Sequence, residues 1–132
     1  MKITFSTLVV LVVLTVTLGA CQSAAGETII INEQHAGQTI ELNTGDFLEV
    51  MLNGNITTGF NWVPAPQNPE LLEQVGDVQV TPASDLIGAP GVIVLKFKAI
   101  RAGETNLHLD YKQPWDAATA PEQTFDVTVV VN

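Results

Sequence analysis

Apolar and polar residues alternate along much of the chain beyond residue 27, with the period of two that is typical of half-buried β-strands. The pattern is clearest in residues 92–101, 105–112 and 123–131, each of which carries one strongly apolar set. Because successive side chains in a strand point to opposite sides, these sets predict three long strands that share one core. The side chains expected to face inward are Ile93, Leu95, Phe97, Ala99, Thr105, Leu107, Leu109, Tyr111, Phe125, Val127, Val129 and Val131.

Shorter segments have the same strand-like character, and they are residues 28–32, 38–42, 47–53, 60–63 and 77–81. Turn residues such as Asn43-Thr44-Gly45-Asp46 separate them, and prolines fall at strand ends, where they remove no ladder hydrogen bond. Residues 68–74 are compatible with one helical turn or with a loop. The predicted fold is an all-β antiparallel sandwich of seven to eight strands.

The first 20 residues have the features of a secretory signal peptide. Lys2 supplies a positive start, residues 8–18 form an apolar run, and small residues follow it. The ending Leu18-Gly19-Ala20-Cys21 resembles the bacterial lipobox, in which the cysteine becomes the lipidated first residue of the mature protein. A plain signal peptide or an anchor helix with an incidental cysteine is the alternative. We therefore expect an exported protein whose Cys21 holds it on the bacterial inner or outer membrane, facing the periplasm or the exterior.

The mature chain is long enough for one domain with one core. Residues 21–27 are small and polar and predict a flexible tether, which leaves residues 28–132 for the domain. The whole chain has five basic and 14 acidic residues; losing Lys2 with the signal leaves four against 14, a net charge of −10. Such an acidic chain is not expected to bind nucleic acid. Cys21 is the only cysteine, and its lipidation leaves no thiol for a disulfide. We also expect a monomer without cofactor or metal.

The direction of the strands predicts which loops lie together. Successive strands of an antiparallel sandwich run in opposite directions, so every second loop lies at the same end. The first loop, Gly54–Gly59, the second loop, Pro82–Gly91, and the third loop, Gln113–Glu122, should therefore cluster. They are also the three most unusual loops, because they carry threonines, a Leu-Ile pair and a tryptophan that no strand needs. Such a cluster predicts a binding surface.

The first loop is longer than a tight hairpin turn requires. Two threonines and a second glycine follow Gly54-Asn55, and Phe60 and Trp62 come next, two residues apart on one strand face. Both rings should point into the core and fix a short projecting loop with its tip at residues 56–58. An ordinary hairpin turn before a core strand is the alternative interpretation.

Taken together, the three loops resemble those of the chagasin-type inhibitors of papain-like cysteine peptidases, which are immunoglobulin-like sandwiches. The family's Asn-Pro-Thr-Thr-Gly-aromatic motif, with a tryptophan two residues on, stands here as Asn55-Ile56-Thr57-Thr58-Gly59-Phe60-x-Trp62. Its Leu/Ile-Gly-x-Gly-Gly type segment stands as Leu86-Ile87-Gly88-Ala89-Pro90-Gly91. Its Arg-Pro-Trp motif stands as Gln113-Pro114-Trp115, after Leu109-x-Tyr111. The likeness covers residues 28–131.

The resemblance implies a reversible, non-covalent inhibitor whose first loop enters the catalytic cleft while the other two loops lie on either side. Thr57 would lie nearest the catalytic cysteine and histidine, with Thr58 and Gly59 holding the loop's shape. The implied peptidase-binding residues are Asn55, Ile56, Thr57, Thr58, Gly59, Phe60, Leu86, Ile87, Gly88, Gly91, Gln113, Pro114 and Trp115.

This chain departs from the family motifs at three positions. Ile56 replaces a proline, from which we expect inhibition weaker by about 1 kcal/mol because the loop is less preorganised. Pro90 replaces a glycine, and Gln113 replaces an arginine. With Asp116 after Trp115, these changes imply a preference for peptidases without acidic cleft rims, and faster association with basic ones.

Two other classes of function were weighed. An enzyme is disfavoured because His35 and His108 are the only histidines, no serine lies in a nucleophile context, and no Cys/His cluster has metal spacing. The sequence Asn55-Ile56-Thr57 also fits the N-glycosylation pattern, which is incidental in a bacterial lipoprotein. The stronger alternative is an immunoglobulin-like adhesion or assembly module that binds a non-peptidase partner on the cell surface.

Overall fold

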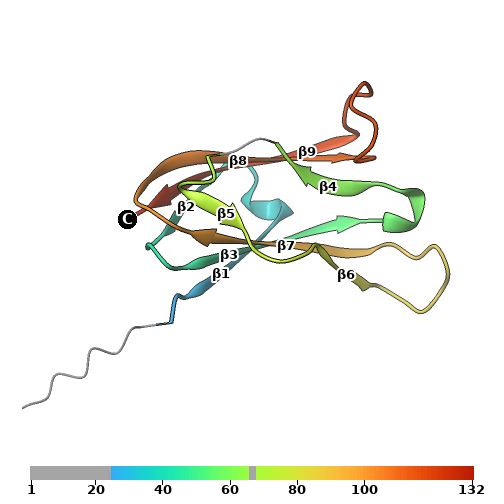
Figure 1. Cartoon of the computed structure of the whole chain (residues 1–132). Helices are drawn as coiled ribbons and strands as arrows, with labels where there is room; N and C mark the ends of the chain where they lie inside the picture. Colours follow the sequence, from blue (N-terminus) through green and yellow to red (C-terminus); the bar gives the residue numbers. More distant parts are fainter. Residues whose placement is uncertain (1–24, 66–67) are drawn as a thin grey trace, which may run out of the picture.

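The fold is a sandwich of two β-sheets, described here from a computed structural model over residues 25–65 and 68–132. The predicted signal peptide, Cys21 and most of the predicted tether lie outside these residues. Figure 1 shows the two layers, and two short 3-10 turns are the only helical elements in the described part. None of its helices is long and apolar enough to cross a membrane.

The sheets have five and four strands. The first has the order β1 (Thr28–Asn32), β3 (Phe47–Gly54), β7 (Gly91–Ala99) and β5 (Leu72–Gln74), and β6 (Gln79–Pro82) also pairs with β7. The second has the order β2 (Thr39–Leu42), β9 (Gln123–Val131), β8 (Gly103–Lys112) and β4 (Asn61–Pro64). The 3-10 turns are η1 (Glu33–His35) and η2 (Ile56–Thr58).

The core lies between the sheets and follows the predicted alternation. Along β7 every second residue, from Ile93 to Ala99, is fully buried, and β8 and β9 bury alternate residues in the same way. Thr105 is the one residue of the predicted inward sets that stays only half-buried, because it lies near the start of β8. Within residues 25–65 and 68–132, all buried apolar residues fall between Ile31 and Val131, so a protein that begins after Cys21 keeps every core contact described here.

Phe60 and Trp62 lie where the core meets the loops. The prediction that both rings point into the core is confirmed for Trp62 and only in part for Phe60. Trp62 is only 3% exposed and its ring lies 5.1 Å from that of Tyr111. Phe60 precedes β4 and is half-buried at the edge of the core, 5.4 Å from the same tyrosine ring. Trp62 therefore belongs to the core, whereas Phe60 covers its margin.

The segment 68–74 was wrongly expected to hold a helical turn or loop throughout. A turn over its first residues leads into β5, where Leu71 and Leu72 are buried and Leu72 pairs with Ala99. β5 and β6 both run antiparallel to β7, so they are two pieces of one edge strand that breaks between them. The described residues thus form nine strands where seven to eight were expected, yet the direction of the later strands is unchanged.

The sandwich is not purely antiparallel, which corrects a second expectation. β1 pairs with β3 in parallel, and β2 pairs with β9 in parallel. The chain changes sheets at η1, whose start is capped by Asn32, so β1 and β2 never form a hairpin with each other. β1 and β2 therefore each pair with a strand that does not adjoin them in the sequence and that runs in the same direction.

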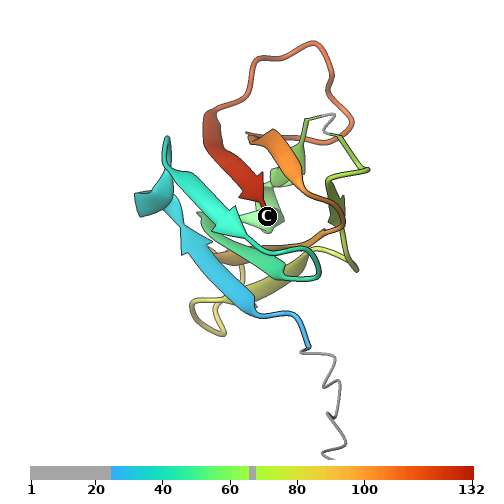
Figure 2. The same ribbon diagram turned by 90° about the vertical axis from the view of Figure 1, so that its left-hand side faces the viewer.

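The two ends of the sandwich carry different parts of the chain. The segment 44–47 contacts the start and the end of the domain: Phe47 N donates to Glu27 O at 2.7 Å, and Thr44 N donates to Asn132 O at 2.9 Å. In Figure 1 these lie on the left, and the β3–β4, β6–β7 and β8–β9 loops lie on the right. Figure 2 looks along the sandwich from the end that carries the C-terminus. The clustering of the three loops is thereby confirmed.

Candidate functional site: three loops at one end of the sandwich

The tip of the first loop is a single 3-10 turn, Ile56–Thr58, capped at both ends. Asn55 caps its start: the side-chain Oδ1 accepts from Thr57 N at 3.1 Å and from Thr57 Oγ1 at 2.6 Å. Gly59 ends it in the left-handed conformation, with φ +83°, where its N–H donates to Ile56 O. Ile56, Thr57 and Thr58 are exposed, so the turn projects a closed and hydrogen-bonded tip.

The base of this loop is fixed by the opposite sheet. Asn55 N donates to the hydroxyl of Tyr111 at 2.8 Å, and Trp62 Nε1 donates to Asn53 O at 3.0 Å. Gly54 permits this approach, because a Cβ there would lie 2.5 Å from Ile93 Cδ1. Tyr111 faces inward, as its place in the alternating strand predicted. Its hydrogen bond to the first loop crosses the sandwich, so the spacing of residues in the sequence does not reveal it.

Two side-chain amides join the first loop to both of its neighbours. Asn55 Nδ2 donates to Gly88 O in the second loop at 3.0 Å. Gln113 Nε2, in the third loop, donates to Thr58 O at 3.3 Å. Asn55 and Gln113 were predicted as peptidase contacts, and the structure shows that both amides already bond within the protein. They join the three loops into one hydrogen-bonded unit.

Gly59 also allows the third loop to lie against the first. A Cβ on Gly59 would come within 2.6 Å of Cη2 of the Trp115 ring, so only glycine fits the present position of that ring. Trp115 itself is 72% exposed, and Pro114 beside it is exposed too. The tryptophan therefore rests one edge on the first loop and leaves most of its surface free.

Beyond Trp115, the third loop is held by Asp116. Its carboxylate accepts from Thr119 Oγ1 at 2.6 Å and from the N–H groups of Ala118 and Thr119. The hydroxyl of Thr119, followed by these backbone N–H groups, holds the pKa of the Asp116 carboxyl below its usual range. Asp116, predicted to add a negative charge to the surface, thus also shapes the loop.

The second loop is a hairpin that continues the β6–β7 ladder before opening at its tip. Ala83 N donates to Pro90 O at 2.9 Å, and Ala89 N donates to Leu86 O at 3.1 Å. Leu86 is 76% exposed and Ile87 is fully exposed, as expected of residues that no strand requires. Gly91, predicted as a peptidase contact, is instead buried in β7, where a Cβ would lie 2.4 Å from Thr81 O. Its role is to let β6 and β7 pair closely.

Comparison with known proteins agrees with this geometry. Residues 41–129 match the chagasin family of peptidase inhibitors, I42. The chain belongs to the chagasin family. Amoebiasin-1 of Entamoeba histolytica is 32% identical to it over 103 residues, which are 76% of this chain and 97% of amoebiasin-1.

Solved structures share the chagasin-family fold at lower identity. EhICP2, a cysteine protease inhibitor from Entamoeba histolytica, has a TM-score of 0.69 and 21% identity over 80% of this chain and 96% of its own. PbICP-C, solved in complex with falcipain-2, has a TM-score of 0.53 and 22% identity over 81% of this chain and 100% of its own. Family membership makes this protein a cysteine peptidase inhibitor and not an enzyme. The adhesion module gains no support.

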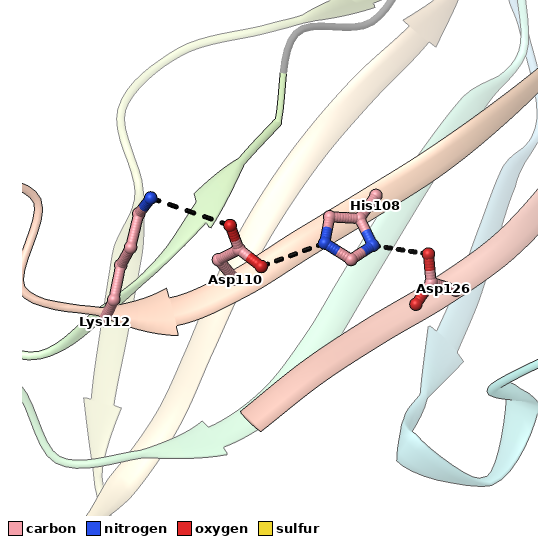
Figure 3. Close-up of polar contacts among 4 residues, drawn as sticks. All are labelled: His108, Asp110, Lys112 and Asp126. Carbon is pink, nitrogen blue, oxygen red and sulfur yellow. Dashed lines mark hydrogen bonds and ion pairs between the residues drawn. The ribbon is translucent and has the colours of Figure 1, made fainter. Parts of the chain in front are cut away.

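His108, weighed above as a catalytic residue, lies in an ionic cluster on the outer face of the four-stranded sheet (Figure 3). Its Nδ1 lies 2.5 Å from Asp126 Oδ1 on β9, and its Nε2 lies 2.9 Å from Asp110 Oδ1 on β8. Lys112 Nζ is 3.6 Å from the other oxygen of Asp110. No group of histidines and acids in the described residues has the geometry of a metal site. The ring of His108 is therefore held between two carboxylates.

Both nitrogens of His108 face carboxylates, which only accept hydrogen bonds, so the doubly protonated ring fits the cluster best. The Asp126 carboxylate, and to a smaller extent that of Asp110, raises the pKa of His108 above its usual value of 6.5. Because the folded pKa is raised, the stabilisation is complete below about pH 6.5 and is lost as pH rises through the folded pKa.

We therefore expect the free energy of unfolding to fall as the pH rises above about 6.5, and His108→Gln to remove this part of the pH dependence. Since His108 is partly exposed, solvent screens the effect and keeps it modest. Urea unfolding at several pH values measures it. His35→Gln is the matched control, since His35 contacts Asn32 rather than a carboxylate. An unchanged pH profile in His108→Gln would show that the cluster contributes nothing.

Asn55→Asp is expected to weaken inhibition about 10-fold with little change in stability. The aspartate keeps the oxygen that caps Thr57, but it replaces the N–H₂ donor to Gly88 O with a second acceptor, and the two oxygens repel. The inhibition constant and NMR relaxation of residues 84–89 measure the effect. Asn55→Ala, which loses the cap as well, should cost more; equal inhibition by wild type and Asn55→Asp would exclude a role for the bond between the loops.

Proposed function

We propose that this chagasin-family protein inhibits papain-like cysteine peptidases by inserting the exposed turn Ile56–Thr58 into the catalytic cleft. The second and third loops then contact the peptidase on either side, through Leu86 and Ile87 and through Pro114 and Trp115. The observation that carries this proposal is an exposed turn that carries two threonines, with exposed Leu86 and Ile87 in one neighbouring loop and exposed Trp115 in the other, all at one end. Exposed tryptophan and aliphatic side chains around a projecting loop are typical of binding hot spots.

The closed shape of the turn supports inhibition without cleavage. Thr58 Oγ1 donates to Asn55 O at 2.7 Å, and Gly59 N donates to Ile56 O at 3.0 Å, so the backbone at the tip curls back on itself. A peptidase bound to this turn meets no extended segment to cut, and the chain offers no free thiol in the described residues to form a covalent bond. Association therefore rests on shape and contact alone.

The hydrogen bonds between loops support tight binding despite Ile56. A proline at that position would restrict the backbone, and its absence predicts a looser loop. The amides of Asn55 and Gln113 restrict the same loop from both sides by a different means. Because ordering a mobile loop costs free energy on binding, these bonds favour the inhibitor and offset part of the loss at Ile56.

A jump-dilution experiment tests the proposed mechanism. Papain saturated with the protein and diluted below the inhibition constant should regain full activity, and the inhibitor should keep its intact mass. Slow recovery is compatible with tight binding. Permanent inactivation, or a cut within residues 54–60, would contradict non-covalent inhibition by an uncleaved first loop.

We further propose that lipid on Cys21 anchors this monomeric protein to the bacterial cell envelope. The lipobox-like ending supports the anchor, and the entry of the chain at the end opposite the loops fits it, because an anchored domain then presents its loops away from the membrane. Cys21→Ala should move the protein from the membrane to the soluble fraction. An equal distribution of both forms would contradict lipidation.

A further inference from the structure

A hollow lies between the first and second loops, beside the tip of the first loop. It has a volume of about 310 Å³, and none of the three motifs predicts it. One wall is formed by Ile56 and Thr57, the opposite wall by the second loop from Ser84 to Ala89, and Val80 and Gly91 lie at its base. The hollow is therefore a product of how the first loop and the β6–β7 hairpin lie together.

The lining of this hollow is suited to an apolar group. Ile56, Leu86 and Val80 contribute aliphatic side chains, and Asp85 is the only charged residue among those that line it. A cavity of about 150 Å³ already accommodates a benzene ring. The hollow thus has room for a leucine, phenylalanine or tryptophan side chain, and its single acid disfavours an acidic one.

The hollow is already formed in the free protein. Asn55 Nδ2 donates to Gly88 O at 3.0 Å, and this bond joins the base of one wall to the other. The β6–β7 ladder, continued by the bond from Ala83 N to Pro90 O, holds the second loop from below. A preformed pocket binds its ligand without an ordering cost, which is a property of specific subsites.

We propose that this pocket receives a bulky aliphatic or aromatic side chain from the rim of the peptidase's catalytic cleft. The inference rests on the proposed function: Ile56 and Thr57 belong both to the inserted tip and to the pocket wall, so the rim beside the tip passes over the mouth of the pocket. An anchor side chain in a desolvated pocket is a common source of interface affinity. The pocket would then determine which peptidases are inhibited strongly, favouring those with a large apolar residue at that rim position over those with an acidic one.

Filling the pocket tests the proposal. Ala89→Trp adds a large side chain to one wall, at a half-buried position in an exposed turn whose backbone hydrogen bond it keeps. Ala102→Trp, an exposed position between β7 and β8 at the other end, is the matched control. We expect Ala89→Trp to raise the inhibition constant at least 10-fold for any peptidase that wild type inhibits strongly, among papain and cathepsin L-type enzymes, and Ala102→Trp to leave it unchanged.

Thr57→Arg, measured in parallel, separates this inference from the proposed function. Loss of inhibition in Thr57→Arg with less than twofold change in Ala89→Trp would overturn the pocket and leave the insertion of the first loop intact. Failure of wild type to inhibit either enzyme would overturn both. A concentration-dependent dimer of wild type that Ala89→Trp abolishes, seen by sedimentation, would assign the pocket to a second copy of this chain instead.

Discussion

Thr57→Arg is expected to raise the inhibition constant for papain at least about 100-fold, while the stability of the fold stays nearly unchanged. Thr57 is exposed at the tip of the first loop, so the domain tolerates a larger side chain there. In the complex proposed above, the same position would lie deepest in the cleft, where an added guanidinium group would meet enzyme atoms on all sides. The loss of the bond from Thr57 Oγ1 to Asn55 Oδ1 adds a smaller effect.

Thr57→Ser is the matched control, because it keeps the hydroxyl that bonds Asn55 and removes only a methyl group. It should inhibit within a few-fold of wild type. Inhibition rates across a concentration series measure both variants, and thermal unfolding verifies that each is folded. If Thr57→Arg inhibits as well as Thr57→Ser, the tip does not enter the cleft.

Gly59→Ala is expected to weaken inhibition roughly 10- to 100-fold, because two effects act together. A non-glycine residue in the left-handed conformation costs about 1–2 kcal/mol, and Gly59 has φ +83°. The new Cβ would also lie 2.6 Å from the Trp115 ring, so the ring must move. The substitution therefore distorts the first loop and displaces the contact surface of the third loop at the same time.

Gly45→Ala separates backbone strain from displacement of the tryptophan. Gly45 has φ +96°, a Cβ there meets no atom within 4 Å, and the residue lies at the end opposite the loops. It should lower the melting temperature to an extent similar to Gly59→Ala without changing the inhibition constant. Equal inhibition by the two variants would show that the contact between Gly59 and Trp115 has no role in binding.

The alternation in the sequence predicted the long strands of the core and the end of the sandwich at which the three loops lie together. Alternation in β7, β8 and β9 identified every buried apolar residue of these three strands, because a buried strand face carries apolar residues at every second position. The loops cluster as predicted even though β5 was missed. β5 and β6 run in the same direction along β7, so the additional strand does not reverse the later ones.

Strand partners were harder to predict, because pairing depends on the position of segments distant in sequence. The run Thr28–Asn32 looks like any short strand, and nothing in it reveals that its neighbour is the parallel β3. Likewise Leu71 and Leu72 form too short an apolar pair to distinguish a strand end from a helical turn. In each case the deciding contacts join residues that no local pattern connects.

For the binding end, the motifs identified the exposed residues but not the bonds among them. Leu86, Ile87 and Trp115 are as exposed as their surroundings predicted. Asn55 and Gln113 were assigned to the peptidase, whereas their amides bond Gly88 and Thr58. The residue type of a polar side chain is the same whether it binds a partner protein or a neighbouring loop. Only the three-dimensional contacts distinguish these two roles.

Titration of papain with the protein truncated to begin after Cys21 tests the central claim most directly. The truncation removes Cys21, the proposed lipid site, and keeps every core residue of the described part of the chain. We predict reversible inhibition with an inhibition constant between nanomolar and low micromolar, overcome by raising the concentration of a small substrate that occupies the cleft. No inhibition of papain or of a cathepsin L-type enzyme at tens of micromolar would contradict the proposed insertion of the first loop into the catalytic cleft.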